Sequence, residues 1–206
     1  MGGYQVTDIQ HVKLSGIATF AYGYTDTAKD SGNYRFIRIT DIDENGKLTS
    51  ASPKYISGSK TELEKYILKK NDLLMARTGA TYGKTMLFQS EEPSVYASFL
   101  IRIRFKDARI LPQYYWHFAQ SHLYWDQTNK LVGGGAQPQF NATSLSEILV
   151  PIPSISEQER IIEVLDRFDC LVNDLKSGLP AEIKARQQQY EYYRDKLLTF
   201  KRKAVA

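Results

Sequence analysis

The last quarter of the chain carries the pattern that most restricts the fold. From about residue 155, apolar residues recur four and three positions apart, which is the spacing of a heptad seam along one side of a helix. The seam residues are Ile161, Leu165, Phe168, Val172 and Leu175. Ser156, with Glu159 three residues later, matches a capping box and predicts where this helix begins. The pattern therefore requires a long amphipathic helix whose apolar side is covered by another surface.

A second helix is predicted after a short turn. Ser177-Gly178 is typical of a helix end, and Pro180 suits the first turn of a new helix. Its two rows of residues seven apart are Ile183, Tyr190 and Leu197, and Arg186, Tyr193 and Phe200. At 1.5 Å per residue each helix is about 30 Å long, more than a small domain needs as cover. We predict a helical hairpin over residues 154–206 that contacts a partner chain. Simple cover for the rest of the protein is the alternative.

Residues 1–153 show short strands and loops instead. The patterns of "YRFIRITDI", "KTMLFQS", "SFLIRIRF" and "EILVPIP" each predict a strand. In "SFLIRIRF", the alternation places Phe99 on the same side as Ile101 and Ile103. Asn45-Gly46 indicates a turn, and "LPQYYWHFAQSHLYWDQTNKL" indicates one helix. The fold class expected is α+β, with a mixed α/β domain followed by a coiled-coil-like helical hairpin.

Composition narrows the setting of the protein. Of the 206 residues 42% are hydrophobic, which is enough for one buried domain and an appendage. No run reaches the ~20 apolar residues of a membrane span. The one cysteine, Cys170, is expected in the core and has no second cysteine to pair with, which fits a reducing, cytoplasmic setting. The net charge of +4, with the surplus mostly in the first 154 residues, permits binding to nucleic acid.

The glycine-rich run "ARTGATYGKT", residues 76–85, looks at first like a nucleotide-binding loop. That motif needs one more residue between its glycines and a helix after its Gly-Lys-Thr end. The strand pattern "MLFQS" follows here, so no helix amino terminus is expected to hold a triphosphate. The three histidines and Cys170 lack metal-ligand spacing. The sequence therefore predicts no catalytic residue, no cofactor and no metal site.

The same run carries groups suited to DNA. Arginine and lysine contact phosphates or guanine edges, hydroxyls hydrogen-bond to either, and glycines allow close approach. The loops "AYGYTDTAKDSGN" and "GGGAQPQFN" offer similar chemistry, with glutamines as possible adenine readers. The candidate DNA-binding residues are Tyr22, Lys29, Arg77, Thr78, Thr81, Tyr82, Lys84, Gln137 and Gln139. A hairpin loop with incidental charges is the alternative for residues 76–85.

Several of these segments resemble the specificity subunits of type I restriction-modification systems. The most specific part is "LVPIPSISEQERIIEVLDRFDCLV", in which a Pro-x-Pro strand end leads into Glu157-Gln158 and an apolar helix, followed by "ARQQQYEYYRDKLLTF". "FIRITDIDENGKL", "NDLLMARTGATYGKT" and "GGGAQPQFNATSLSEILVPIP" are similar to pieces of that family's target recognition domain. The resemblance covers nearly the whole chain.

The resemblance implies a non-catalytic role. The domain of residues 1–153 would read one half of a bipartite sequence in double-stranded DNA. The helical region would space two such domains and dock methyltransferase subunits, with restriction subunits joining through the complex. Catalysis, S-adenosylmethionine and ATP would belong to those partners.

Family members usually carry two recognition domains and two helical regions in a chain about twice this long. This chain has one of each, so it is a natural half-length subunit or a piece of a longer one. We expect it to form a homodimer through the seam residues and to read a palindromic bipartite site. A coiled-coil scaffold without a DNA role and a recognition subunit of another DNA modification system are the alternatives. The target sequence itself cannot be read from residue spacing.

Overall fold

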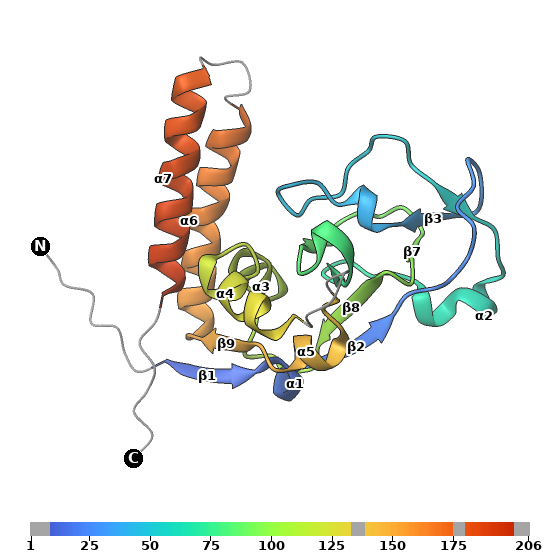
Figure 1. The fold of residues 1–206 in the computed structure, drawn as a ribbon, viewed down its shortest axis with the longest axis horizontal. Helices are drawn as coiled ribbons and strands as arrows, with labels where there is room; N and C mark the ends of the chain where they lie inside the picture. The colour runs from blue at the N-terminus through green and yellow to red at the C-terminus, as the bar shows by residue number, and fades with distance from the viewer. Residues whose placement is uncertain (1–8, 133–138, 175–179, 200–206) are drawn as a thin grey trace, which may run out of the picture.

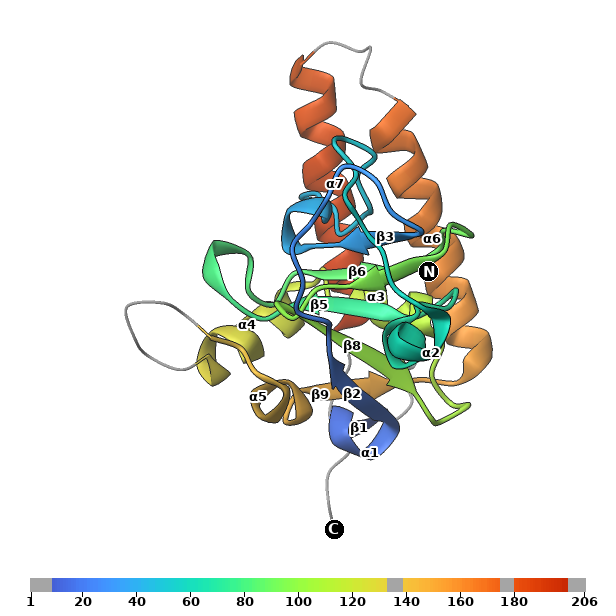
Figure 2. The same ribbon diagram turned by 90° about the vertical axis from the view of Figure 1, so that its right-hand side faces the viewer.

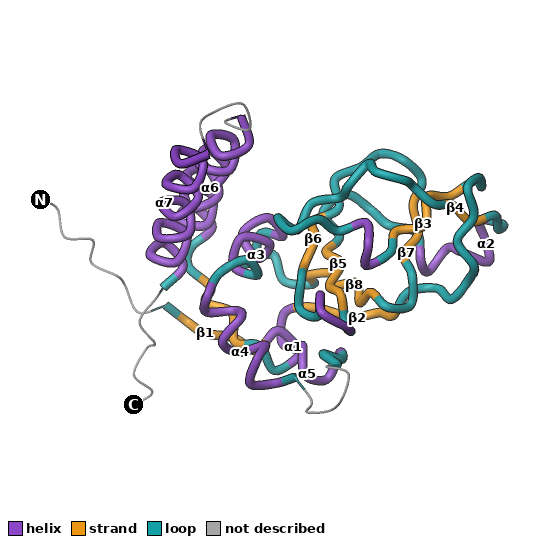
Figure 3. Tube along the Cα trace, turned by 45° about the horizontal axis from the view of Figure 1, so that its top comes forward, coloured by secondary structure: helices purple, strands orange, loops and turns teal. Residues whose placement is uncertain are grey.

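The computed structural model describes residues 9–132, 139–174 and 180–199. Strands and helices are both present, as the α+β expectation requires, and they are unevenly distributed (Figures 1 and 3). Residues up to 153, here called the head, hold every strand of the described chain. Two long helices, α6 (Ile155–Asp174) and α7 (Pro180–Leu198), stand beside the head as a hairpin.

The head is built on a four-stranded antiparallel sheet in the order β2-β8-β5-β6. Its strands are β2 (Ala18–Tyr22), β8 (Leu100–Phe105), β5 (Leu73–Ala76) and β6 (Thr85–Leu87). Ile103 lies opposite both Phe20 and Leu73, and this register aligns the apolar rows across the sheet. Figure 2 shows the sheet from the side away from the hairpin.

Both faces of this sheet are buried at β5. In β5, Leu73 and Met75 contribute to one apolar cluster, whereas Leu74 and Ala76 contribute to another. Because successive side chains of a strand point to opposite faces, a strand buried on both sides must be apolar throughout, and "LLMA" is. The sheet therefore forms the central layer of the head.

Helices cover one face of the sheet. They are α3 (Pro112–Phe118), α4 (His122–Leu131) and the first turns of α6, with the short helices α1 (Leu14–Ile17) and α5 (Ala142–Ser146) at the edge. Aromatic rings fill the space between them, including Tyr115, Phe118 and Tyr124, which contact one another edge to face or tilted. This is the larger of the apolar clusters.

A second sheet covers the other face. It has the order β4-β3-β7, formed by β4 (Tyr55–Ile56), β3 (Tyr34–Ile37) and β7 (Ser94–Tyr96), and its β3 and β7 are parallel. Ile37 and Tyr96 from this sheet contact the cluster that contains Leu74 and Ala76. The helix α2 (Lys60–Leu63) and the 3-10 turn Glu64–Tyr66 close its outer side.

A third, two-stranded sheet connects the start of the chain with the base of the hairpin. Here β1 (Gln10–Lys13) pairs antiparallel with β9 (Leu149–Ile152), and His11 lies opposite Pro151. Because β9 ends three residues before α6 begins, this pairing holds the base of the hairpin against the head.

Three local expectations differ from the structure. The segment 111–131 forms two helices, because Ser121 is extended and its hydroxyl donates to the Phe118 carbonyl at 2.7 Å, which ends α3. The strand "YRFIRITDI" stops at Ile37 and is followed by the 3-10 turn Ile39–Asp41, since the Asp41 carboxylate accepts the Arg38 amide at 2.8 Å. Cys170 is exposed rather than in the core.

The start of α6 also differs by two residues. The Ser154 hydroxyl accepts the Glu157 amide at 3.3 Å, so Ser154 is the capping residue and not Ser156. Pro180 does occupy the first turn of α7, as predicted. Both Ser154 and Ser156 precede helix-forming residues, so either could cap the helix. The conformation of the backbone after Pro153 decides that Ser154 is the cap.

Candidate nucleic-acid interface

The glycine-rich run forms a tight connection between β5 and β6. Its centre is the 3-10 turn Gly79–Thr81, and the Ala76 amide donates to the Lys84 carbonyl at 2.9 Å. Gly79 and Gly83 have φ of +73° and +80°, a region that favours glycine. The strand β6 follows directly, so no helix amino terminus lies after Gly83-Lys84-Thr85. The strand expected after this run is therefore present.

Arg77 is held at one end of this connection by two aromatic rings. Its guanidinium carbon lies 5.4 Å from the centre of the Tyr22 ring and 5.6 Å from that of the Phe99 ring. Its Nε donates to the Ser98 carbonyl at 3.0 Å. Both rings remain about half exposed, Tyr22 at 47% and Phe99 at 52%. A cation and two aromatic faces thus share one exposed place on the head.

Four chain segments meet around Arg77. Tyr22 ends β2, Phe99 precedes β8, and Thr78 pairs with Gln139 in an isolated antiparallel bridge. The Phe140 amide donates to the Arg77 carbonyl at 2.8 Å. The structure therefore brings together four of the sequence-predicted residues, namely Tyr22, Arg77, Thr78 and Gln139. The Thr78 side chain is largely buried, whereas Gln139 is exposed.

Thr81 and Tyr82 lie on the other side of the connection. The Tyr82 hydroxyl donates to Asn129 Oδ1 at 3.0 Å, and its ring meets Trp125 edge to face. The Tyr82 side chain is thus engaged with α4. Thr81 is half-buried, and its carbonyl accepts the Lys84 amide at 3.1 Å.

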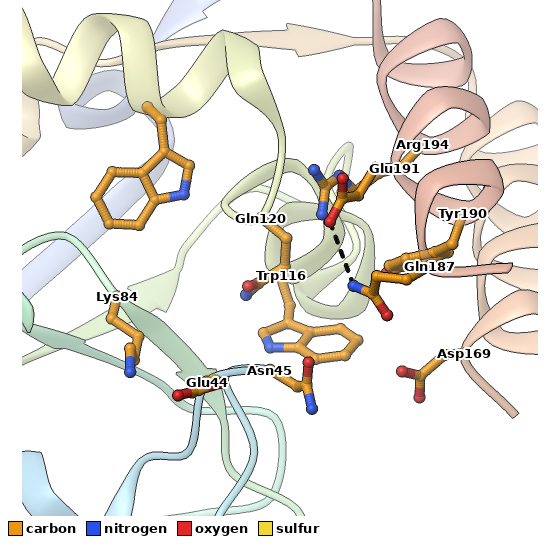
Figure 4. A pocket seen from close by; sticks show the side chains of 11 residues that line it. Glu44, Asn45, Lys84, Trp116, Gln120, Asp169, Gln187, Tyr190, Glu191 and Arg194 are labelled. Carbon is orange, nitrogen blue, oxygen red and sulfur yellow. Dashed lines mark hydrogen bonds between the residues drawn. The ribbon is translucent and has the colours of Figure 1, made fainter. Parts of the chain in front are cut away.

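Lys84 lines a hollow of about 200 Å³ between the head and the hairpin. Figure 4 shows Lys84 and Glu44 on the head side of this hollow, with Gln187, Glu191 and Arg194 on the α7 side. The Lys84 ammonium forms no ion pair within the described part of the chain. Its charge therefore lies at the junction of the two parts and away from the Arg77 cluster.

Lys29 lies apart from the other predicted residues. Its backbone pairs with Tyr55, at the edge of the second sheet, and its side chain is exposed. Gln137 lies outside the described residues. The sequence-predicted set thus divides into the Arg77 cluster, the α4-facing residues, Lys84 at the junction, and Lys29.

The predicted seam of the hairpin is used in part inside the chain. Ile161 and Leu165 are fully buried in the large cluster of the head, and Tyr190 is nearly so. Phe168 stacks on Tyr193 with ring centres 5.3 Å apart, so these two join α6 to α7. Leu197 is half-buried beside them. Ile161 and Leu165 therefore cannot contact a partner chain while they are packed against the head, so any partner contact must come from other residues of the hairpin.

Four other residues of the predicted seam have no described side chain. The side chains of Val172 and Ile183, and all of Leu175 and Phe200, lie outside the described part of the structure. Leu198, which the sequence pattern did not select, is fully buried. Among the side chains of the hairpin that the structure describes, the large apolar ones left exposed are Leu171 at 47% and Tyr192 at 60%, together with Ile155 at the start of α6.

Phe99 and Ser98 are the contributors to the Arg77 cluster that the sequence pattern missed. Strict alternation along "SFLIRIRF" placed Phe99 with the buried Ile101 and Ile103. The strand begins only at Leu100, because residues 97–100 form a turn in which the Leu100 amide donates to the Ala97 carbonyl at 2.9 Å. Serine is common in turns, so Ser98 between two apolar runs could have indicated a turn at this place.

Two further findings concern metal sites and membrane spans. Among the described residues, no group of three or more histidine, cysteine, aspartate or glutamate side chains could hold a metal ion. Within the same residues, no helix has the length and apolar character needed to cross a membrane. His117 is fully buried, and its Nε2 lies 2.8 Å from Asp166, so it connects α3 to α6.

An α+β fold with several polar loops gathered at the ends of its strands is typical of a recognition domain, and comparison with known families gives the particular family. The chain belongs to the family described as the type I restriction modification DNA specificity domain, which matches residues 7–185. The resemblance inferred from the sequence is thereby confirmed.

Particular relatives agree with the family. A putative type I restriction enzyme specificity subunit from Haemophilus influenzae is 35% identical over 132 residues, covering 64% of this chain and 33% of the relative. The EcoprrI specificity subunit from Escherichia coli is 26% identical over 212 residues, covering 96% and 52%. The chain thus spans about half or less of the length of these relatives.

A solved structure gives the same fold. The type I restriction-modification system S subunit from M. genitalium superposes with a TM-score of 0.60 at 14% sequence identity, covering 85% of this chain and 42% of that one. This similarity confirms the α+β fold class.

Proposed function

We propose that this chain recognises a DNA sequence within a type I restriction-modification complex. The head would read one half of a bipartite target in double-stranded DNA. The observation that carries the proposal is the exposed Arg77 cluster, in which a guanidinium and two half-exposed rings lie at the ends of the sheet strands of a specificity-domain fold. Arginine at such a place suits base edges and phosphates alike.

The hairpin would dock methyltransferase subunits, through which restriction subunits join the complex. Bond-making, with S-adenosylmethionine and ATP, would belong to those partners. A cytoplasmic location, where chromosomal DNA and reduced thiols occur together, is part of this proposal. The exposed Leu171 and Tyr192 on the hairpin support a protein surface there, because apolar side chains of this size gain from being covered.

Two copies of the chain would pair through their hairpins, so that two heads face one duplex. The helices have 20 and 19 residues, which at 1.5 Å per residue makes each about 30 Å long. Heads held that far apart match about one turn of DNA, ~34–36 Å. A two-fold pair would read a palindromic target with an unspecified gap of several base pairs.

Methylation mapping tests the proposal. The chain is expressed with its methyltransferase subunit in cells that lack other modification systems, and methylated bases are located by sequencing the genome. The expected result is methylation within one bipartite palindromic motif that disappears when this chain is omitted. Methylation that is unchanged without the chain would contradict a recognition role, and a scaffold without a DNA role would then explain the hairpin better.

A further inference from the structure

We propose that Tyr22 and Phe99 are positioning residues for sequence readout, which brace Arg77 so that it presents a rigid pair of donors to one guanine of the target. The inference rests on the proposed function and assigns a specificity role to Phe99, which the sequence pattern had placed in the core. Its basis is the geometry around a single guanidinium.

In the Arg77 guanidinium, one nitrogen donates a hydrogen bond within the protein and the other two nitrogens remain available to a ligand. Nε of Arg77 donates to the Ser98 carbonyl at 3.0 Å, which fixes the plane of the group. The terminal Nη1 and Nη2 amino groups have no hydrogen-bond or ion-pair partner among residues 9–132, 139–174 and 180–199. Arginine is planar and always charged, so a fixed plane fixes the direction of both remaining donor groups.

The support of Arg77 is itself anchored. Its amide donates to the Phe99 carbonyl at 3.1 Å, and its carbonyl accepts the Phe140 amide at 2.8 Å. The Tyr22 hydroxyl accepts the Ala142 amide at 3.2 Å, which ties that ring to α5. The rings and the backbone thus restrict Arg77 before any ligand arrives, and little side-chain entropy is left to lose on binding.

A guanine edge fits this arrangement better than a phosphate. Guanine presents O6 and N7 in the major groove, and a paired arginine donor is the commonest specific contact to it. A phosphate can also accept a paired arginine donor, but it offers no apolar edge for the two flanking rings to contact. Half-exposed rings on Tyr22 and Phe99 would lie beside the neighbouring bases, where apolar contact with a thymine methyl group is favourable.

The test uses the complex of this chain with its methyltransferase subunits. A library of random duplexes first identifies the selected half-site, and each guanine in it is then replaced by 7-deazaguanine, which lacks the N7 acceptor. The wild-type complex is expected to bind one such duplex roughly 10- to 100-fold more weakly than the natural one. Arg77→Ala, which removes both donor groups, is expected to abolish that difference.

The brace is tested with three ring variants. Phe99→Leu and Tyr22→Leu are expected to reduce the 7-deazaguanine effect several-fold at that same guanine. Tyr22→Phe, which keeps the ring but releases it from the Ala142 amide, is expected to reduce the effect less than Tyr22→Leu does. Tyr55→Leu, at a half-buried tyrosine of β4, is the matched control and should leave the effect unchanged. Circular dichroism and thermal melting confirm that each variant is folded.

The outcomes separate this inference from the function on which it rests. A complex that selects a sequence, but is insensitive to 7-deazaguanine at every position or selects a half-site without guanine, overturns the brace and leaves recognition intact. The brace is also overturned if Arg77→Ala weakens binding to all duplexes equally and lowers the salt dependence by about one phosphate. A complex that selects no sequence overturns both proposals.

Discussion

At the scale of single residues, Gly83 meets two separate demands. Its φ of +80° favours glycine, and a Cβ there would lie 2.9 Å from Thr128 Cγ2 and 3.1 Å from Trp125 Cζ3 on α4. Gly79, in the same connection, has a φ of +73° but nothing within 4 Å of its would-be Cβ. The two glycines therefore separate the cost of backbone strain from the cost of close packing.

This pair gives a prediction about stability. Gly79→Ala is expected to lower the free energy of unfolding by about 1–2 kcal/mol, through the left-handed backbone alone. Gly83→Ala adds overpacking against α4 and is expected to cost about 2–4 kcal/mol in total. Urea unfolding of both variants measures the difference. Equal losses would show that the connection moves away from α4 without cost.

The sequence identified the residues of this connection but not their neighbours. Glycine spacing and the strand pattern after Lys84 were enough to exclude a triphosphate site, because both are local. That Tyr82 faces α4 and Lys84 faces α7 depends on how distant elements pack. Phe99 was misplaced for a local reason, because a turn at residues 97–100 shifted the start of the strand.

At the scale of elements, the junction of α6 with the head depends on one buried glutamine. Gln158 is fully buried, and its Nε2 donates to the Arg109 carbonyl at 2.7 Å and to the Pro153 carbonyl at 2.9 Å. Its Oε1 accepts the Leu111 amide at 2.9 Å. One turn of α6 further on come Ile161 and then Leu165, which enter the large apolar cluster. The first half of α6 is therefore packed into the core of the head.

Replacing Gln158 tests this junction. Gln158→Leu keeps much of the side-chain volume but leaves the Leu111 amide and the two carbonyls without their partner. Each unsatisfied buried group costs about 1–3 kcal/mol, so we expect the unfolding free energy to fall by roughly 2–5 kcal/mol. Gln188→Leu, at an exposed site of α7, is the control. A change as small as that of the control would mean that water replaces the glutamine.

The attachment of α7 should depend on alkaline pH. Burial raises the pKa of Tyr190 to about 12 from the usual 10.0. The folded state thus favours the neutral phenol, so this contribution is complete below pH 10 and is lost as the pH rises toward 12.

Tyr190→Phe removes the titrating group and isolates this effect. Between pH 9 and pH 11, the unfolding free energy of the variant should fall by about 1 kcal/mol less than that of the wild type. Urea unfolding at the two pH values gives the comparison, and Tyr192→Phe, at an exposed site, is the control. An identical fall in both variants would show that Tyr190 is reached by solvent.

Helices and strands were largely predictable because their apolar periodicity is local. The boundaries were less so: the gap between α3 and α4 comes from Ser121, whose hydroxyl bonds to the preceding turn in a way that the apolar pattern does not reveal. At the end of α7, Leu198 rather than the seam residue Leu197 is fully buried, because the head as well as α6 determines which side is covered.

At the scale of the whole molecule, the division into head and hairpin was predicted from the change of pattern near Pro153. The sequence could not distinguish a hairpin that covers the head from one that meets a partner. In the structure, Ile161 and Leu165 pack against the head. Leu171 and Tyr192 remain exposed, and a partner could contact them.

Pairing of two chains is therefore expected to depend on the exposed residues. Leu171→Glu combined with Tyr192→Glu should weaken self-association at least tenfold without lowering the melting temperature of the monomer, because neither side chain is in the core. Thr199→Glu, at an exposed site near the end of α7, is the charge control. Sedimentation equilibrium measures the association. Wild-type protein that stays monomeric at all concentrations, with or without methyltransferase, would contradict the paired arrangement.

The sheet that is buried on both faces limits how such a protein can acquire a new target. A mutation in β5 disturbs one apolar cluster or the other, whereas Tyr22, Arg77 and Phe99 belong to neither cluster. Evolutionary change should therefore accumulate in the turns around Tyr22, Arg77 and Phe99, so that natural variants exchange their DNA preference while inheriting an unaltered scaffold.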